Sequence, residues 1–239
     1  MGFVWSNGLH RIYVLDYHLS GNMRLLVVQI HPDVNQAVAR HYPLWLNAGF
    51  DRIIGTTSRF EGTVWPGDAA DLIEVGEYGY IAGARLPKKF LGALACGLLH
   101  GAAEIVVIEW DCLLFGTFPS PLPPGFTSNV TGGPQAGYKC TRFFHCPWAF
   151  TAEAAKAAVI EGQKMIDEGD IEGGTTDCFI GRLVDRLALP VNTGFFTSYS
   201  QNAFDLPGSL EAAREAYLAG AHAIHGCKSE RELNFIFAP

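Results

Sequence analysis

The feature that most constrains the fold is a short apolar run that ends in two carboxylates. Residues 105–108 read Ile-Val-Val-Ile, and Glu109-Trp110-Asp111 follow directly. A β-branched run of this length is too short for a helix and is typical of a strand buried on both faces of a sheet. The sequence therefore predicts an α/β sheet in which residues 105–111 form a central strand.

Two acidic side chains at the end of that strand mark a candidate site. Ligands of open α/β sheets gather at the carboxyl ends of the strands. Because side chains at i and i+2 of an extended segment point the same way, Glu109 and Asp111 are expected to converge and Trp110 to point elsewhere. Carboxylate oxygens suit Mg²⁺ or Mn²⁺. An acidic strand end that only leads into a loop is the alternative interpretation.

The segments around this strand alternate between strand and helix patterns. Apolar runs predict buried strands at residues 25–30 and 50–57, and the helix-length segment between them predicts a βαβ unit with parallel strands. Asp33 is expected to cap that helix. The remaining predicted elements are a possible hairpin within residues 11–22, short strands at 72–75 and 191–196, helices at 88–99, 151–166, 177–187 and 209–218, and an apolar C-terminal tail.

Composition describes one globular domain and excludes some classes of partner. The chain has 239 residues, of which 49% are hydrophobic and 17% charged. That length and apolar content predict a single sizeable core, and no repeat or linker divides the chain. The net charge of −7 argues against a nucleic-acid coat and a polybasic membrane anchor, whereas a nucleotide needs only a local positive cluster.

Three further signals concern the compartment. No basic region followed by a long apolar one opens the chain, so no signal peptide is expected. The longest apolar stretch, 90–108, is interrupted by polar residues and glycine, and is interpreted as a helix and a strand, not as a transmembrane segment. Six cysteines without a C-x-x-C pair predict buried free thiols in a cytoplasmic protein. Cys140, His145 and Cys146 lack the spacing of a structural zinc site.

Three segments carry a family resemblance. They read GARLPKKFLGALACGLLHGAAEIVVIEWD at 83–111, GGTTD at 173–177 and AIHGCK at 223–228. With the order of strands and helices, they resemble the nucleotide-sugar-dependent glycosyltransferases of the GT-A fold, family 2-like and related enzymes. The resemblance implies a single GT-A-like α/β domain with a mostly parallel twisted sheet flanked by helices. Its implied parts are an N-terminal elaboration (1–23), a Rossmann-like nucleotide-binding half (24–116), and an acceptor-binding half with the C-terminal segment (117–239).

The resemblance also implies a metal centre. In that family two carboxylates at the end of this strand hold a divalent metal, Mn²⁺ or Mg²⁺, against the donor diphosphate. Glu109 and Asp111 occupy the matching positions, and Glu109 departs from the usual Asp, which leaves its direct ligation open. His225 matches a third metal ligand, and Lys228 matches a phosphate-binding residue. The chemistry is consistent, because neutral imidazole ligates metals and an ammonium neutralises phosphate charge.

Donor-binding residues are implied at two other places. The ends of the first two predicted strands, with His31, Asp33 and Thr57, are expected to face the nucleoside base and ribose. A basic cluster can hold the diphosphate, or can be a solvated turn; it comprises Arg85, Lys88 and Lys89.

Acceptor-binding residues are implied in the second half. Asp177 follows Thr175 and Thr176, either of which can cap a helix. The resemblance implies Asp177 as a general base in an inverting enzyme, while its position in a first helical turn is equally explained by the helix dipole. Trp148 is a candidate stacking platform for an acceptor sugar, with a place in the core as the alternative.

The resulting hypothesis is a metal-dependent glycosyltransferase of the hexosyltransferase type. Its donor would be a UDP- or GDP-sugar and its acceptor is not identified by the sequence. A sugar nucleotidylyltransferase shares much of this fold and is one alternative. A GT-A domain that binds a nucleotide-sugar or glycan without turnover is another.

Overall fold

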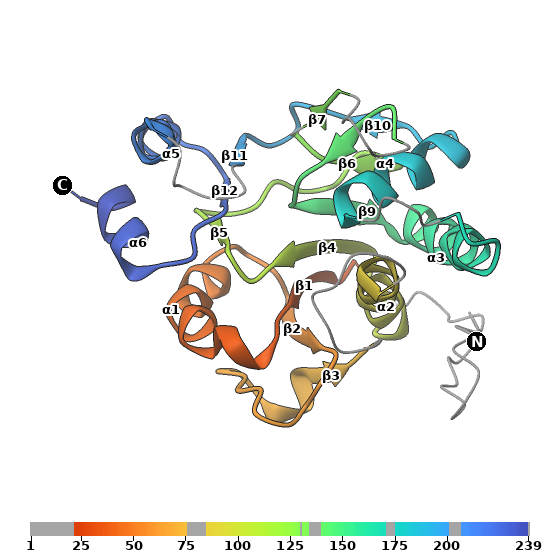
Figure 1. Ribbon diagram of the computed structural model, residues 1–239, viewed down its shortest axis with the longest axis horizontal. Helices are drawn as coiled ribbons and strands as arrows, with labels where there is room; N and C mark the ends of the chain where they lie inside the picture. Colours follow the sequence, from red (N-terminus) through yellow and green to blue (C-terminus); the bar gives the residue numbers. More distant parts are fainter. Residues whose placement is uncertain are drawn as a thin grey trace.

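In the computed structural model, the apolar run at 105–108 lies in β4 (Glu104–Glu109), the middle strand of a seven-stranded sheet (Figure 1). The structure describes residues 22–75, 85–129, 131–133, 140–170, 175–200 and 207–238. The strand order is β10-β6-β9-β4-β1-β2-β3. The other strands of this sheet are β1 (Arg24–Gln29), β2 (Arg52–Thr57), β3 (Leu72–Glu74), β6 (Phe126–Thr127), β9 (Trp148–Thr151) and β10 (Val191–Asn192).

Smaller sheets and helices complete the described chain. The three-stranded sheet β11-β12-β5 contains β5 (Cys112–Leu114), β11 (Ser198–Ser200) and β12 (Ala223–His225), and a two-stranded sheet pairs β7 (Thr131–Gly132) with β8 (Phe143–Phe144). The α-helices are α1 (Asn35–Leu46), α2 (Arg85–Leu99), α3 (Ala152–Asp167), α4 (Thr176–Arg186), α5 (Ser209–Leu218) and α6 (Glu230–Ile236), and the short 3-10 helices are η1 (Pro32–Val34) and η2 (Ala69–Asp71).

The pairing of the strands confirms a mostly parallel α/β sheet. β1 pairs in parallel with β2 and with β4, and β2 pairs in parallel with β3. β9 is inserted antiparallel between β4 and β6. The register of β1 with β4 places Gln29 opposite Glu109, so both strands end at the same edge of the sheet. Ligand-binding residues are expected at that edge.

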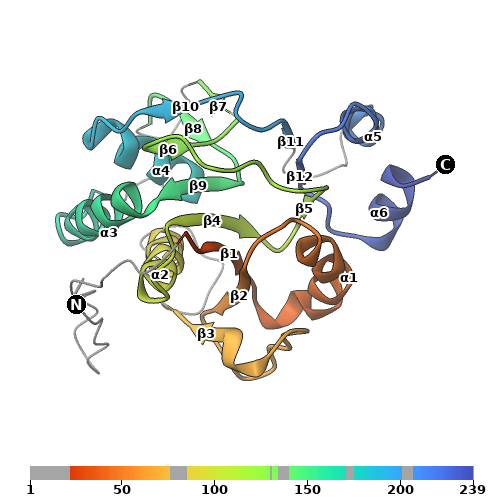
Figure 2. The same cartoon turned by 180° about the vertical axis from the view of Figure 1, so that it is seen from behind.

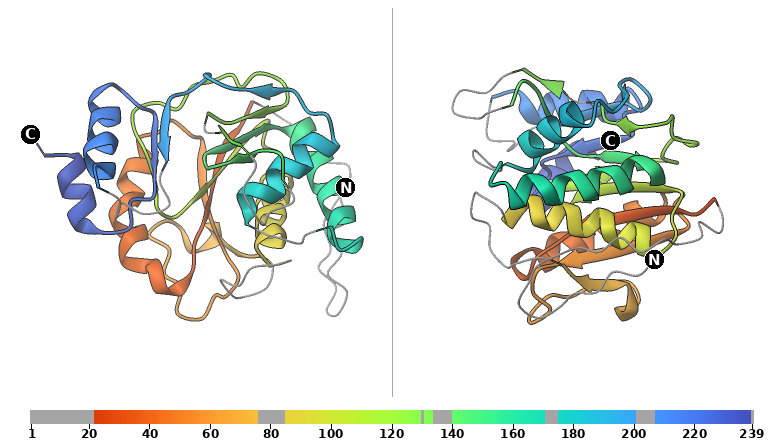
Figure 3. Two further views of the ribbon diagram at one scale, coloured as in Figure 1. Left: turned by 45° about the horizontal axis from the view of Figure 1, so that its top comes forward. Right: turned by 90° about the vertical axis from the view of Figure 1, so that its right-hand side faces the viewer.

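The core explains why β4 is apolar throughout. Residues 105–108 of β4 and 25–28 of β1 are all fully buried, because helices cover both faces of these strands. α1 and α2 lie on opposite sides of β1 and β2, and α5 and α6 extend the side of α1 (Figure 1, Figure 2). α2 and α3 run side by side against the sheet (Figure 3). The close approach of α2 to β4 requires a small residue, since a Cβ on Gly97 would lie 2.7 Å from Ile105 Cδ1.

Several boundaries differ from those predicted by sequence. The predicted strand 105–111 ends at Glu109, and Trp110 and Asp111 form a turn into β5. Asp33 does not cap a helix, so that prediction is wrong: Pro32 opens η1, and α1 starts at Asn35 without a side-chain cap. The apolar tail contains α6, which has a capping box between Ser229 and Glu232. The predicted hairpin within residues 11–22 falls almost entirely outside the described residues.

Two strands of the main sheet, β6 and β9, had no counterpart in the sequence predictions. β9 follows the Phe-Phe-His-Cys-Pro stretch at 143–147. The residues of β9 itself do not alternate between apolar and polar, because both faces of this strand are buried. Among the described residues, no helix is both long and apolar enough to cross a membrane.

A glycine sets the position of α4 against β8. A Cβ on Gly181 would overlap the main-chain carbonyl oxygen of Arg142, so α4 reaches this distance only with glycine there. We expect Gly181→Ala to lower the free energy of unfolding by about 1–3 kcal/mol, because backbone cannot move aside as a flexible side chain can. Urea denaturation measures the effect. Gly133→Ala is the matched control and should be nearly neutral, since its Cβ would meet no atom of the described residues within 4 Å.

Candidate active site

Three separate segments meet in one pocket at the carboxyl end of β4. The pocket has a volume of about 220 Å³. Its walls come from the turn after β4, the start of α4 and the end of β12, with one residue of α2. The lining residues are Leu86, Glu109, Asp111, Thr175, Thr176, Asp177, His225 and Lys228. Five of the residues that the sequence singled out therefore line one cavity.

Strand pairing places His225 beside Asp111. β12 pairs antiparallel with β5, opposing His225 to Cys112, the residue after Asp111. The amides of Gly226 and Cys227 then both donate to the main-chain oxygen of Asp111, at 3.1 and 3.0 Å. Gly226 has a φ of 104°, which L side chains rarely adopt. The turn after β12 is thus tied directly to the turn after β4.

The side chains of these turns form a carboxylate–imidazole cluster. His225 Nε2 lies 3.1 Å from Glu109 Oε2 and 3.4 Å from Asp111 Oδ1. Lys228 Nζ lies 3.9 Å from the other oxygen of Asp111. Ser200 Oγ hydrogen-bonds His225 Nδ1 at 2.9 Å and so fixes the orientation of the ring. The two carboxylates converge as predicted, although Asp111 lies in a turn and not in the strand.

Trp110 points away from this cluster, which also agrees with the prediction. Its ring contacts His31 edge-on, with ring centroids 6.0 Å apart. Its main-chain oxygen contacts His41 Nδ1 at 2.9 Å. Trp110 therefore separates the cluster from the ends of β1 and α1.

Burial and charge act against each other in the cluster. Burial alone would raise the pKa of Asp111, but His225 and then Lys228 hold it below its ordinary value. Burial alone would lower the pKa of His225, but Cys146 and Asp111 raise it well above the usual range. Burial raises the pKa of Glu109, against its hydrogen bond to His225. A proton on His225 and a divalent cation are alternative ways to balance the charge of Asp111.

The donor set fits a divalent metal. Asp111 is 5% exposed, and its buried Oδ1 makes no hydrogen bond, so this oxygen has coordination capacity to spare. Ligand atoms of Glu109, Cys146 and His225 all lie within 4.8 Å of one another. Carboxylate oxygens with one imidazole suit Mn²⁺ and related ions. Cys146 belongs to this group, whereas the sequence analysis considered it only together with Cys140 and His145, a trio that lacks the spacing of a structural zinc site.

Asp177 lies across the same pocket, in the first turn of α4. Thr175 caps the helix, with its side chain accepting from Cys178 N at 3.3 Å, as one of the two predicted caps. Asp177 Oδ2 lies 3.0 Å from His145 Nδ1. The His145 ring also packs against that of His225, with centroids 5.8 Å apart. His145 was overlooked because no local pattern connects it to Asp177.

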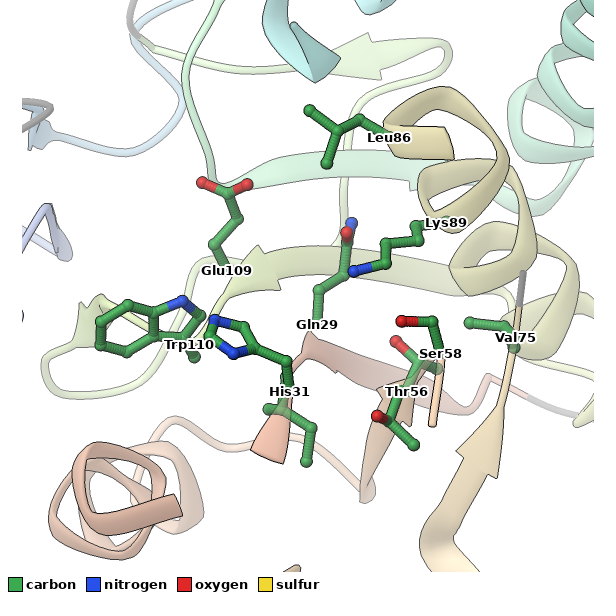
Figure 4. Close-up of a pocket in the computed structure, with 11 residues that line it drawn as sticks. Gln29, His31, Thr56, Ser58, Val75, Leu86, Lys89, Glu109 and Trp110 are labelled. Carbon is green, nitrogen blue, oxygen red and sulfur yellow. The ribbon is translucent and has the colours of Figure 1, made fainter. Parts of the chain in front are cut away.

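A second, smaller pocket adjoins the first and shares Leu86 and Glu109 with it (Figure 4). Its remaining lining residues are Gln29, Ile30, His31, Thr56, Thr57, Ser58, Val75, Lys89 and Trp110. Gln29 Nε2 and Ser58 Oγ are buried there without hydrogen-bond partners. Lys89 reaches from α2 toward Gln29, and burial lowers its pKa. Sequence reasoning identified His31, Thr57 and Lys89, and did not identify Gln29 or Ser58.

The remaining sequence candidates lie elsewhere. Asp33 is largely exposed and contacts His31 at 3.5 Å without lining either pocket, and Lys88 also lines neither. The side chain of Arg85 falls outside the described part of the chain. Trp148 is fully buried: its ring packs on Phe90, and its Nε1 donates to the carbonyl of Phe144. The interpretation of Trp148 as a stacking platform is therefore wrong, because neither ring face reaches a pocket.

Comparison with known proteins places the fold. No protein-family model matches the chain, and no curated protein matches its sequence. Among solved structures, the apo form of the glycosyltransferase GlyE from Streptococcus pneumoniae TIGR4 is similar, with a TM-score of 0.52 and 10% sequence identity. The superposition covers 92% of this chain and 61% of that one, so this chain spans less than two thirds of its neighbour. The chain thus has a mixed α/β, GT-A-like glycosyltransferase fold.

Proposed function

We propose that the protein transfers a hexosyl group from a nucleotide-diphosphate donor, with a divalent metal, to an acceptor whose chemistry is open. The observation that carries this proposal is the meeting of three segments in one pocket. Glu109 and Asp111 come from the end of β4, Asp177 from α4, and His225 with Lys228 from the end of β12. A pocket with metal-binding, phosphate-binding and proton-accepting groups is what glycosyl transfer requires.

The donor would occupy both pockets. The smaller one offers buried polar atoms of Gln29 and Ser58 for a nucleoside, and Thr57 forms part of its wall. Lys89 lines this pocket together with Glu109, which the larger pocket shares, and this suits a ligand whose phosphates lead toward the larger pocket. The larger pocket would then hold the sugar and the acceptor. This arrangement supports a nucleotide-binding half at 24–116 and an acceptor-binding half at 117–239, with 1–23 as an elaboration.

Each side chain has a distinct part in the proposed transfer. Asp111, Glu109 and His225 would hold Mn²⁺ or Mg²⁺, which supplies charge neutralisation for the leaving diphosphate. Lys228 donates to the phosphate oxygens as negative charge develops on the leaving group. Asp177 accepts the proton of the attacking hydroxyl, and His145 keeps the Asp177 carboxylate in place through the 3.0 Å contact. Leu86 excludes water from the junction of the two pockets.

Thermal unfolding with UDP and GDP, each with and without Mn²⁺, tests the proposal. A nucleotide at saturating concentration should stabilise the protein by roughly 2–4 kcal/mol, and the effect should need the metal. Release of UDP or GDP from nucleotide-sugars, with water as the acceptor, then separates an enzyme from a binding domain. Pyrophosphate release from a nucleoside triphosphate with a sugar 1-phosphate would indicate a nucleotidylyltransferase instead. Absence of stabilisation by both diphosphates would contradict nucleotide binding.

Lys228 should matter more for turnover than for nucleoside binding. We expect Lys228→Ala to lower donor turnover by roughly 10²-fold while nucleotide affinity falls much less, because its charge acts mainly on the leaving diphosphate. Steady-state release of the nucleoside diphosphate measures the first quantity, and calorimetric titration the second. Lys164→Ala on α3, an exposed lysine paired with Glu161, is the matched control. Equal losses in both measurements would show that Lys228 only binds the ground state.

A further inference from the structure

A fourth potential ligand lies beside the carboxylate–imidazole cluster. Cys146 is fully buried between β8 and β9, so strands of two sheets hold it on both sides. Its sulfur lies with an oxygen of Glu109 and a nitrogen of His225 in a group whose members are all within 4.8 Å of one another. The buried Oδ1 of Asp111, which makes no hydrogen bond, lies 3.4 Å from the same imidazole. The thiol and this carboxylate oxygen thus approach His225 from different segments.

These four donors differ in chemical hardness. Mg²⁺ favours oxygen ligands, keeps several waters and gains little from sulfur. Zn²⁺ and Co²⁺ accept carboxylate, imidazole and thiolate together, at about 2.0–2.3 Å from the ion. Ligand atoms around one such ion are therefore separated by no more than about 4.6 Å. The ligand atoms of Glu109, Cys146 and His225, all within 4.8 Å of one another, lie close to that limit.

We infer that Cys146 is an additional ligand of the metal centre and that the centre binds borderline divalent cations such as Zn²⁺ in preference to Mg²⁺. The inference rests on the proposed metal centre and adds the class of metal that it selects. The soft sulfur ligand accounts for this preference among metals. A centre made only of the two carboxylates and the imidazole would also accept Mn²⁺.

The binding step is balanced without any redox change. The S–H bond of Cys146 breaks, its proton passes to buffer, and the sulfur lone pair forms the bond to the metal. The metal keeps its oxidation state. Metal binding should therefore release one proton more in the wild type than in a variant without this thiol.

Titration of the wild-type protein with Co²⁺ and Cd²⁺ tests the inference without any assay of activity. Thiolate ligation gives a sulfur-to-metal charge-transfer absorption in the ultraviolet, and a cadmium-113 resonance shifted in the direction typical of sulfur ligation. The cadmium resonance needs no variant, so it remains informative if a substitution impairs folding. Competition between Zn²⁺ and Mg²⁺ gives the selectivity.

Cys146→Ser should remove the absorption. It should also lower the affinity for Zn²⁺ by more than the roughly 10–100-fold loss of metal affinity that follows removal of a residue that only hydrogen-bonds a ligand. Its Mg²⁺ affinity should stay unchanged. Cys112→Ser and Cys227→Ser replace other buried thiols of this region and are the matched controls, which should retain the absorption. Asp111→Asn should weaken the metal binding of wild type and of Cys146→Ser alike.

Three results overturn the inference, and the first two are distinguishable from failure of the proposed function. Binding of Co²⁺ and Cd²⁺ without sulfur signals would exclude Cys146 and leave the oxygen–imidazole centre in place. Persistence of the absorption in Cys146→Ser, with its loss in a control variant, would assign it to another thiol. If none of the four ions Mn²⁺, Co²⁺, Cd²⁺ and Zn²⁺ binds, both the inference and the metal dependence proposed above are overturned.

Discussion

Replacing Asp111 by Asn is expected to abolish the metal-dependent part of nucleotide binding. The substitution keeps the size of a buried side chain but removes the charge that faces His225 and Lys228. A metal clamp on a phosphate contributes several kcal/mol, so nucleotide affinity in Mn²⁺ should fall by roughly 100-fold or more. Calorimetric titration of UDP and GDP with and without Mn²⁺ measures the change.

Two measurements secure that interpretation. Circular dichroism and a urea melt of Asp111→Asn establish that the variant is folded, which matters because removal of one partner from a buried charged group is destabilising. Asp167→Asn, at the end of α3 and outside both pockets, is the matched control and should bind like wild type. A folded Asp111→Asn protein with unchanged affinity in Mn²⁺ would show that Asp111 does not hold the metal.

Asp177→Asn is expected to lower turnover by roughly 10²- to 10⁴-fold, the usual contribution of a general base. A sugar hydroxyl has a high pKa, and an amide of the same size cannot take its proton. Donor binding should remain nearly unchanged, because Asp177 lies across the pocket from Lys228 and the carboxylate cluster. Release of nucleoside diphosphate from the donor measures turnover, and calorimetry measures binding.

The same helix supplies a control for Asp177. Asp185→Asn removes a carboxylate of α4 that pairs with Arg142 outside the pocket, and turnover should change by less than about twofold. A fall of less than tenfold for Asp177→Asn would exclude proton removal by this residue from the rate-limiting step. Asp177 would then be a helix-start carboxylate or an acceptor contact, and a retaining mechanism would be preferred.

The prediction for Trp148, in the second half of the chain, shows most clearly where the pattern of neighbouring residues is not sufficient. Trp148 stands in the aromatic-rich stretch FFHCPWAF and was a candidate binding aromatic, but the structure places it in the core because β9 is inserted between β4 and β6. Insertion of a strand depends on the pairing of segments far apart in the sequence, which no window of neighbouring residues encodes. Asp33 is a different case, because its own neighbour Pro32 begins η1 before the helix.

The sequence by itself determined the central strand, the parallel βαβ unit, the helices after residues 85 and 151, and the convergence of Glu109 with Asp111. Each of these follows from side-chain period, residue propensity or cap chemistry, which act over a few neighbouring residues. Only the tertiary structure decided that Cys146 lies beside His225, that His145 contacts Asp177, and that Gln29 and Ser58 face one pocket with Lys89. These groupings depend on strand order and on the register of β12 against β5, which are set by packing of the whole core rather than by local sequence.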